Sequence, residues 1–176
     1  MTAQAGTGAS VGIIGLGYVG LPLAVAFAEA GHDIVALDAD PSKVAAIQAG
    51  ESYIEDIPAA RLQAVLNRLH PTTRYADLRA ADAVVIAVPT PLNANREPDL
   101  QPLLSAGAAL ARVLREGQLV VLESTTYPGT TRDRLAPLLE ESGLHAGRSF
   151  NLAFSPERID PGRTDYTLRT TPAGSG

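Results

Sequence analysis

Short apolar runs and longer helical patterns alternate along almost the whole chain. Largely apolar runs, typical of strands covered on both faces of a sheet, occupy Val11–Ile14, Ile34–Leu37, Ala83–Val88, Gln118–Leu122 and Phe150–Phe154. Between them, apolar residues recur at the spacing of one buried helix face. This alternation predicts a single α/β domain of the Rossmann-like, doubly wound type, with a mainly parallel sheet and helices on both faces.

Proline and glycine delimit the predicted helices. We expect helices from the turn at Gly20 to Gly31, from Pro41 to Gly50, from Pro58 to Pro71, from Leu100, capped by Asp99, to about Leu114, and through Leu135, Leu138 and Leu139. The third carries a stripe of leucine and valine at helical spacing that ends with Leu69. A short strand is expected at Thr73–Tyr75, and loops at 51–57, 89–99 and 123–130.

The first apolar run leads into a glycine-rich turn, Gly15-Leu-Gly-Tyr-Val-Gly20, that opens the first helix. A phosphate-binding turn needs Gly15 for tight geometry, Gly17 for close approach of a pyrophosphate, and Gly20 for close packing of helix on strand. Negative charge is favoured at that helix N-terminus, where backbone N–H groups are free. The alternative is an ordinary strand-to-helix turn with no ligand, because such turns often use glycine.

An acidic residue stands where a dinucleotide-binding unit requires one. Asp38 ends the second apolar run, 23 positions after Gly15, and such a residue hydrogen-bonds a ribose 2′-hydroxyl. Ala39 and Asp40 offer no arginine for a 2′-phosphate, although Lys43 lies close. We therefore predict NAD rather than NADP, with Asp38 as a mere N-terminal helix cap as the alternative.

Composition and charge remove several classes of function. Hydrophobic residues make up 45% of the chain and charged residues 19%, as in an ordinary globular protein. The formal net charge is −5 and the sequence has no run of basic residues, so nothing supports nucleic-acid binding. Residues 1–28 are uncharged, but glycines and Pro22 interrupt them and no basic segment precedes them, so we expect no membrane span and a cytoplasmic location. The absence of cysteine excludes thiolate chemistry, and His32, His70 and His145 lack metal-ligand spacing, so no metal is predicted.

Four motifs together resemble one family, the nucleotide-sugar 6-dehydrogenases that oxidise UDP-glucose, GDP-mannose and their N-acetylated relatives. They are Gly15–Pro22, Val88–Pro91, Glu123–Thr131 and Phe154–Gly162, in the family's order, and the last two look most like the branch acting on UDP-N-acetylhexosamines. The resemblance runs from Val11 to about Pro172 and corresponds to the family's N-terminal NAD-binding domain. It implies NAD as cofactor and a UDP-sugar as substrate.

The resemblance also implies residue roles. Cofactor contacts would come from Gly15, Gly17, Tyr18, Val19, Gly20, Asp38, Lys43, Thr90 and Thr125. Thr125 would also lie beside the reacting centre, and Glu157 would orient or activate water in a hydrolytic step. Without the resemblance, the two threonines could equally satisfy backbone groups in proline-bounded turns, and Glu157 could be a solvated acid.

The chain departs from the family where the chemistry is hardest. Family members oxidise a primary alcohol twice, using a cysteine thiolate, a lysine and a second, sugar-binding domain that would all lie beyond residue 176. We therefore expect a disordered tail at 1–10, an NAD-binding domain at 11–162 and an irregular tail at 163–176, at a truncation point. Self-association through exposed apolar surface is expected as well.

Two rival functions stay open. One is a stand-alone or degenerate dinucleotide-binding module without catalysis, which the lack of cysteine favours. The other is a different two-domain dehydrogenase, such as a hydroxyacid type, which shares the glycine turn but does not need the Ser-Thr-Thr-Tyr-Pro-Gly-Thr or Ser-Pro-Glu-Arg segments.

Overall fold

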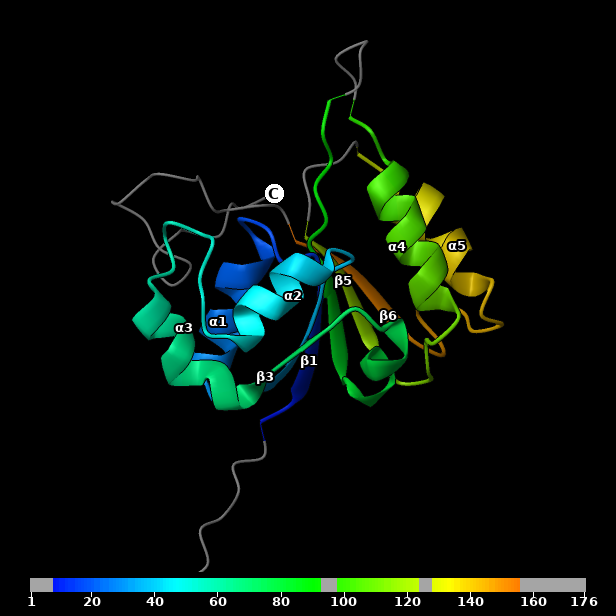
Figure 1. Ribbon diagram of the computed structural model, residues 1–176. Coiled ribbons are helices and arrows are strands. Elements are labelled where there is room, and N and C mark those ends of the chain that lie inside the picture. The colour runs from blue at the N-terminus through cyan, green and yellow to red at the C-terminus, as the bar shows by residue number, and fades with distance from the viewer. Residues whose placement is uncertain (1–7, 93–97, 124–127, 156–176) are drawn as a thin grey trace, which may run out of the picture.

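Six parallel strands form one sheet at the centre of the molecule. The computed structural model describes residues 8–92, 98–123 and 128–155 (Figure 1). The strands are β1 (Ser10–Ile14), β2 (Asp33–Leu37), β3 (Leu69–Thr72), β4 (Ala83–Ile86), β5 (Leu119–Glu123) and β6 (Asn151–Ser155). Their order is β3-β2-β1-β4-β5-β6. This is the strand order of a Rossmann fold, so the predicted fold class is confirmed.

Helices cover both faces of the sheet. They are α1 (Gly20–Glu29), α2 (Pro41–Gln48), α3 (Ala59–Val65), α4 (Gln101–Ala111) and α5 (Ala136–Glu140), with 3₁₀ turns at Leu66–Arg68 and Tyr75–Ala80 and a π-helical turn at Thr131–Leu135. In Figure 1, α1 and α3 lie to the left of the sheet, and α4 and α5 lie to the right. The helix α2 overlaps the strands in this view, and its buried Ile47 belongs to the same hydrophobic cluster as residues of α1 and α3. No helix in the described ranges is long and apolar enough to cross a membrane.

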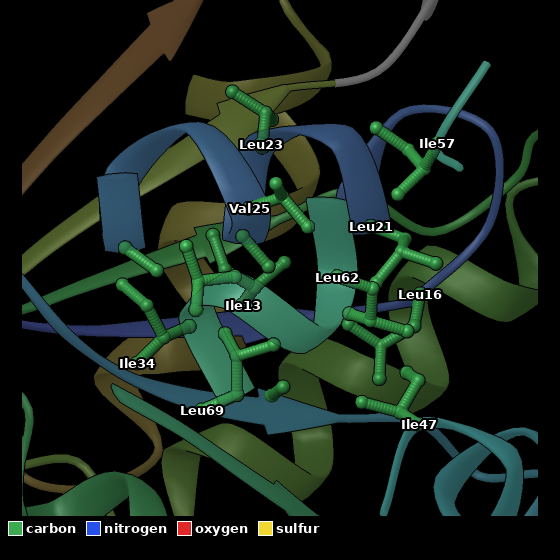
Figure 2. Close-up of a cluster of buried hydrophobic side chains, with 14 of the residues drawn as sticks. Ile13, Leu16, Leu21, Leu23, Val25, Ile34, Ile47, Ile57, Leu62 and Leu69 are labelled. Atoms are coloured by element: carbon green, nitrogen blue, oxygen red, sulfur yellow. The ribbon is translucent and has the colours of Figure 1, made fainter. Parts of the chain in front are cut away.

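Each face of the sheet has its own hydrophobic cluster, because successive strand residues point to opposite faces. In β1, Ile13 belongs to the cluster under α1 and Ile14 belongs to the cluster under α4. Figure 2 shows the first cluster, in which Leu21 and Val25 of α1 belong together with Ile13 and Ile34 of the sheet. Strands buried on both sides in this way explain the continuous apolar runs of the sequence.

The third predicted helix is wrong in its last turn. The α-helix ends at Val65, and Leu69 begins β3, whose residues pair with Ile34–Leu37 of β2. The strand expected at Thr73–Tyr75 therefore lies earlier, at Leu69–Thr72. The apolar residues keep helical spacing as far as Leu69, so the sequence alone favours a helix there. Leu69 is a strand residue because it pairs with Ile34 of β2. Pro71 is tolerated there because β3 is the edge strand and needs no second ladder of hydrogen bonds.

The register brings the ends of four strands to one level. Ile14 of β1 pairs with Leu37 of β2 and Ile86 of β4, and Leu122 of β5 follows in the same row. The residues that come next, Gly15, Asp38, Ala87 and Glu123, therefore meet at the C-terminal edge of the sheet. β1 has neighbours from both halves of the chain, which makes its end the topological switch point where ligands bind in such sheets.

Candidate functional site

The three glycines of the turn differ in their surroundings, as the sequence predicted. Gly15 has a φ of +93°, a left-handed conformation that suits glycine, and a Cβ there would lie 2.8 Å from the carbonyl oxygen of Ala87. A Cβ on Gly20 would overlap the carbonyl oxygen of Gly15, so α1 can approach the turn only without a side chain. Around Gly17 no atom lies within 4 Å of such a Cβ, so this position faces open space.

Three consecutive backbone donors within the turn have no partner in the described part of the chain. Leu16 donates its N–H to Asp38, but the N–H groups of Gly17, Tyr18 and Val19 take part in none of the hydrogen bonds formed there. The helix begins immediately afterwards, at Gly20, and has no side-chain cap. Three consecutive free N–H groups at a helix N-terminus form an anion-binding concavity.

Asp38 is tied to the turn by its own carboxylate. The side chain is only 10% exposed, and Oδ2 accepts the Leu16 N–H at 2.8 Å while Oδ1 accepts the Asp40 N–H at 2.9 Å. The Lys43 ammonium lies 3.3 Å from Oδ2. Because a carboxylate offers about four acceptor sites, these three contacts leave capacity for one more donor, such as a ribose hydroxyl.

A cavity of about 500 Å³ joins these residues at the C-terminal edge of the sheet. Its size suits a cofactor or a small-molecule ligand. The lining residues are Gly15, Gly17, Tyr18, Val19, Asp38, Lys43, Tyr53, Ile54, Ala87, Val88, Pro89, Thr90 and Glu123. The structure thus brings together every predicted cofactor residue among the described ones except Gly20, which packs beneath the turn.

Sequence reasoning missed the wall of the cavity that comes from the loop at 51–57. Tyr53 donates its hydroxyl hydrogen to the carbonyl oxygen of Leu16 at 2.7 Å, and Ile54 is 5% exposed. Burial raises the pKa of the Tyr53 hydroxyl, and the charges of Asp38 and Asp40 raise it further. A signal was present, since three large apolar residues, Tyr53, Ile54 and Ile57, are unusual in a short surface loop.

Thr90 and Glu123 also line the cavity. Thr90 follows β4, and Glu123 is the last residue of β5, so both stand at the C-terminal edge beyond the switch point. Glu123 belongs to the Glu123–Thr131 segment but was not singled out as a site residue. Thr125 and Glu157, the two predicted catalytic residues, lie outside the described residues.

The histidines take no part in this site. His32 contacts the Ala9 carbonyl oxygen and the Phe27 ring, His70 lies 3.6 Å from Asp77, and His145 lies 3.9 Å from Glu140. Within 8–92, 98–123 and 128–155, no three residues of the types His, Cys, Asp or Glu gather so that they could hold a metal ion.

Comparison with known proteins places the same motifs in a family context. Residues 9–172 match the model of the UDP-glucose/GDP-mannose dehydrogenase family, NAD binding domain. The UDP-N-acetyl-D-glucosamine 6-dehydrogenase of Pseudomonas aeruginosa is 38% identical over 159 residues, which are 90% of this chain and 37% of that relative. The UDP-N-acetyl-D-mannosamine dehydrogenase of Pyrococcus horikoshii is 41% identical over 157 residues, 87% of this chain and 37% of that relative.

The solved structures agree in fold. The structure of a UDP-D-ManNAc dehydrogenase from Pyrococcus horikoshii superposes with a TM-score of 0.82 at 40% identity, covering 88% of this chain and 37% of that one. This chain therefore spans 37% of the length of each of these two relatives. The shared part is the one that contains the glycine turn, Asp38 and the cavity.

Proposed function

The chain belongs to the UDP-glucose/GDP-mannose dehydrogenase family, as its NAD-binding domain, and on this premise we propose where NAD binds. The proposed site is the cavity at the C-terminal edge of the sheet. The pyrophosphate lies against the turn from Gly17 to Val19, and the adenosine ribose lies at Asp38. Residues 11–162 make up the proposed cofactor domain.

One observation carries this proposal: the open space at Gly17 beside three unpaired N–H groups. A turn that served only to connect β1 to α1 would not need to keep this space empty. Donors at a helix N-terminus that face a cavity are suited to a pyrophosphate, whose oxygens accept hydrogen bonds and whose charge is favoured by the helix dipole.

The choice of NAD over NADP is supported by the charges at the rim. A 2′-phosphate on the adenosine ribose would approach the carboxylate of Asp38, and Asp40 follows two residues later. The nearby cation, Lys43, is paired with Asp38 at 3.3 Å. A 2′-hydroxyl, by contrast, can donate to the remaining acceptor site of Asp38.

We further propose that the domain serves the oxidation of a UDP-sugar at its primary alcohol to a carboxylate. When bound, NAD accepts the hydride. In this proposal Thr90 and Thr125 position the cofactor end that reacts, Thr125 also positions a water or substrate hydroxyl, and Glu157 orients or activates water. The names of the relatives support a UDP-N-acetylhexosamine as substrate.

A second candidate function is a dinucleotide-binding module without catalysis. The observation that favours it is the absence of cysteine from the chain, since no thioester can form on these residues alone. Full turnover is therefore proposed only together with a completing C-terminal domain. Self-association and a cytoplasmic location stay predictions.

The test is a thermal melt of the chain with NAD, NADH, NADP or no ligand. At a concentration a hundredfold above its Kd, a ligand that binds only the folded state should raise the Tm by about 5–10 °C. We expect this rise with NAD or NADH and a smaller one with NADP. Asp38→Ala should abolish the rise, whereas Asp56→Ala, an exposed acid with no polar contact in the described ranges, should keep it. Equal melting temperatures with and without every nucleotide would overturn the proposal.

A further inference from the structure

The loop at 51–57 is a fixed part of the structure rather than a loose connection. The Ser52 hydroxyl donates to the Ile54 carbonyl oxygen at 3.1 Å and accepts the Ile54 N–H at 3.3 Å, which closes a tight turn around Tyr53. Ile54 and Ile57 are 5% and 2% exposed and belong to the hydrophobic cluster under α1. Both sides of the turn are therefore anchored, and the Tyr53 side chain leaves it in a defined direction.

That side chain reaches the glycine turn across 37 residues of sequence. The Tyr53 hydroxyl donates to the Leu16 carbonyl oxygen at 2.7 Å, while the Leu16 N–H donates to Asp38 at 2.8 Å. The carbonyl of Leu16 and the N–H of Gly17 belong to one planar trans peptide, in which the two groups point in opposite directions. A partner that holds the carbonyl therefore also fixes the direction of the Gly17 N–H.

The Tyr53 hydroxyl can serve as a donor throughout the physiological range. Burial and the negative charges of Asp38 and Asp40 raise its pKa above the ordinary value for tyrosine, so the hydrogen stays on the oxygen. Tyr53 as a residue is 36% exposed, and it lines the same cavity as Gly17. The glycine turn that lines the cavity is therefore held in shape by Tyr53, a residue outside the glycine motif.

We propose that Tyr53 is a positioning residue for dinucleotide binding, which holds the Leu16–Gly17 peptide in the orientation that presents the Gly17 N–H to the pyrophosphate. This inference rests on the proposed function. Unlike the proposed function, which covers the whole dinucleotide, it predicts an effect on binding of the phosphates and none on binding of the adenosine. Removal of the hydroxyl leaves the ring and the loop anchors in place but releases the peptide.

The experiment compares Tyr53→Phe with the unchanged chain and with Tyr75→Phe as a matched control. Tyr75 packs in the cluster under α4, and its hydroxyl makes no hydrogen bond among the described residues. Dissociation constants for NADH and ADP are measured by titration calorimetry, and that for adenosine by ligand-observed NMR. Ligand-free melts of all three proteins set a working temperature at which each is folded.

Tyr53→Phe should weaken NADH and ADP about fivefold and leave adenosine unchanged, which is the loss expected for one hydrogen bond in a preorganised turn. Tyr75→Phe should bind all three as the unchanged chain does. Unaltered NADH and ADP binding in Tyr53→Phe would overturn the inference, and so would an equal loss for adenosine. Failure of the unchanged chain to bind NADH or ADP would instead overturn the proposed function, and this inference with it.

Discussion

The two edges of the sheet use their polar groups in opposite ways. At the C-terminal edge, the N–H groups of Gly17, Tyr18 and Val19 are free within the described chain, and these residues line a cavity. At the N-terminal edge, polar groups are consumed internally. Gln118 is completely buried there, and its amide nitrogen donates to the carbonyl oxygens of Leu78 and Ala81 at 3.0 and 2.8 Å.

Charged side chains add further internal hydrogen bonds at the N-terminal edge. The Gln118 amide oxygen accepts the Arg115 N–H at 2.8 Å. The Arg115 guanidinium in turn donates to the carbonyl oxygens of Arg79 and Ala81 at 2.7 and 2.9 Å, and it lies 3.4 Å from Asp82. Asp82 also accepts the Ser10 N–H that begins β1.

The difference shows where stability and binding are placed in this fold. At the N-terminal edge, hydrogen bonds join the segment before β4, the segment before β5 and the first residue of β1. They hold the strands together, because a buried polar group left without a partner costs free energy. Donors kept free at the other edge cost less, because they face a cavity open to solvent until a ligand accepts them. Substitutions at the two edges should therefore separate folding from binding.

The largest effect should come from Gln118→Leu at the N-terminal edge. The change removes three hydrogen bonds and leaves the Arg115 N–H without its partner, whereas the Leu78 carbonyl oxygen keeps the Ala81 N–H as a donor. We expect a loss of about 3 kcal/mol in the free energy of unfolding, measured by urea titration. Affinity for NADH, measured well below the unfolding midpoint, should stay the same.

The matched control is Gln101→Leu. The Gln101 side chain is exposed and makes no hydrogen bond in the described part of the chain, so the variant should differ from the unchanged chain by less than about 0.5 kcal/mol. A loss below about 1 kcal/mol in Gln118→Leu would show that the amide does not hold the edge together.

Gly17→Ala should give the reverse result at the C-terminal edge. A Cβ there meets no protein atom within 4 Å, so the free energy of unfolding should change little. The same methyl group would occupy the space that we assign to the pyrophosphate, and the Kd for NADH should rise about tenfold or more, which corresponds to about 1.4 kcal/mol.

Gly20→Ala provides the contrast within the same motif. Its Cβ would overlap the Gly15 carbonyl oxygen, so this variant should unfold at clearly lower urea concentration. If Gly17→Ala bound NADH as tightly as the unchanged chain, the pyrophosphate could not lie at Gly17.

The smallest effect concerns acid stability at the C-terminal edge. Asp40 precedes α2 and accepts the Ser42 hydroxyl and N–H, and these bonds lower the pKa of its carboxyl. A lowered pKa contributes stability that is present above about pH 4 and is lost as the pH falls through the lowered value. Asp40→Asn keeps an acceptor but not the charge, so the drop in Tm between pH 7 and pH 3 should shrink by about 1–2 °C.

Asp56→Asn serves as the comparison, because Asp56 is exposed and has no polar contact within the described residues. Melts of both variants and the unchanged chain at pH 7, 5, 4 and 3 check the prediction. A drop in Tm that is equal in all three proteins would mean that Asp40 does not contribute to acid sensitivity.

The sequence was sufficient where a local rule determines the structure. Gly15, Gly17 and Gly20 each have the surroundings that their spacing predicted, and Asp38 lies beside them. Rules of this kind concern neighbours in the chain or a single turn, so they can be applied before the fold is known. The NAD prediction agrees with the family's NAD-binding domain.

Sequence reasoning failed where a distant contact decides the outcome. Leu69 satisfies the helix pattern of its segment, yet pairing with Ile34 of β2 makes it a strand residue. Tyr53 lies 37 positions from Leu16, and no local pattern predicts their hydrogen bond. Asp38 was predicted to bind the ribose, with a helix cap as the alternative. Asp40 caps α2 instead, and Asp38 holds the Leu16 and Asp40 N–H groups. The roles of Thr125 and Glu157 stay predictions.

The central place of β1 has a consequence for the order in which the molecule can fold. Ile14 is made early in synthesis, but its partner Ile86 follows 72 residues later, and the Gly15 turn is closed by Ala87. Closing so long a stretch of chain costs entropy before any contact repays it. The cofactor site therefore cannot exist on a nascent chain until β4 has emerged, and until then β1 must persist without its second neighbour.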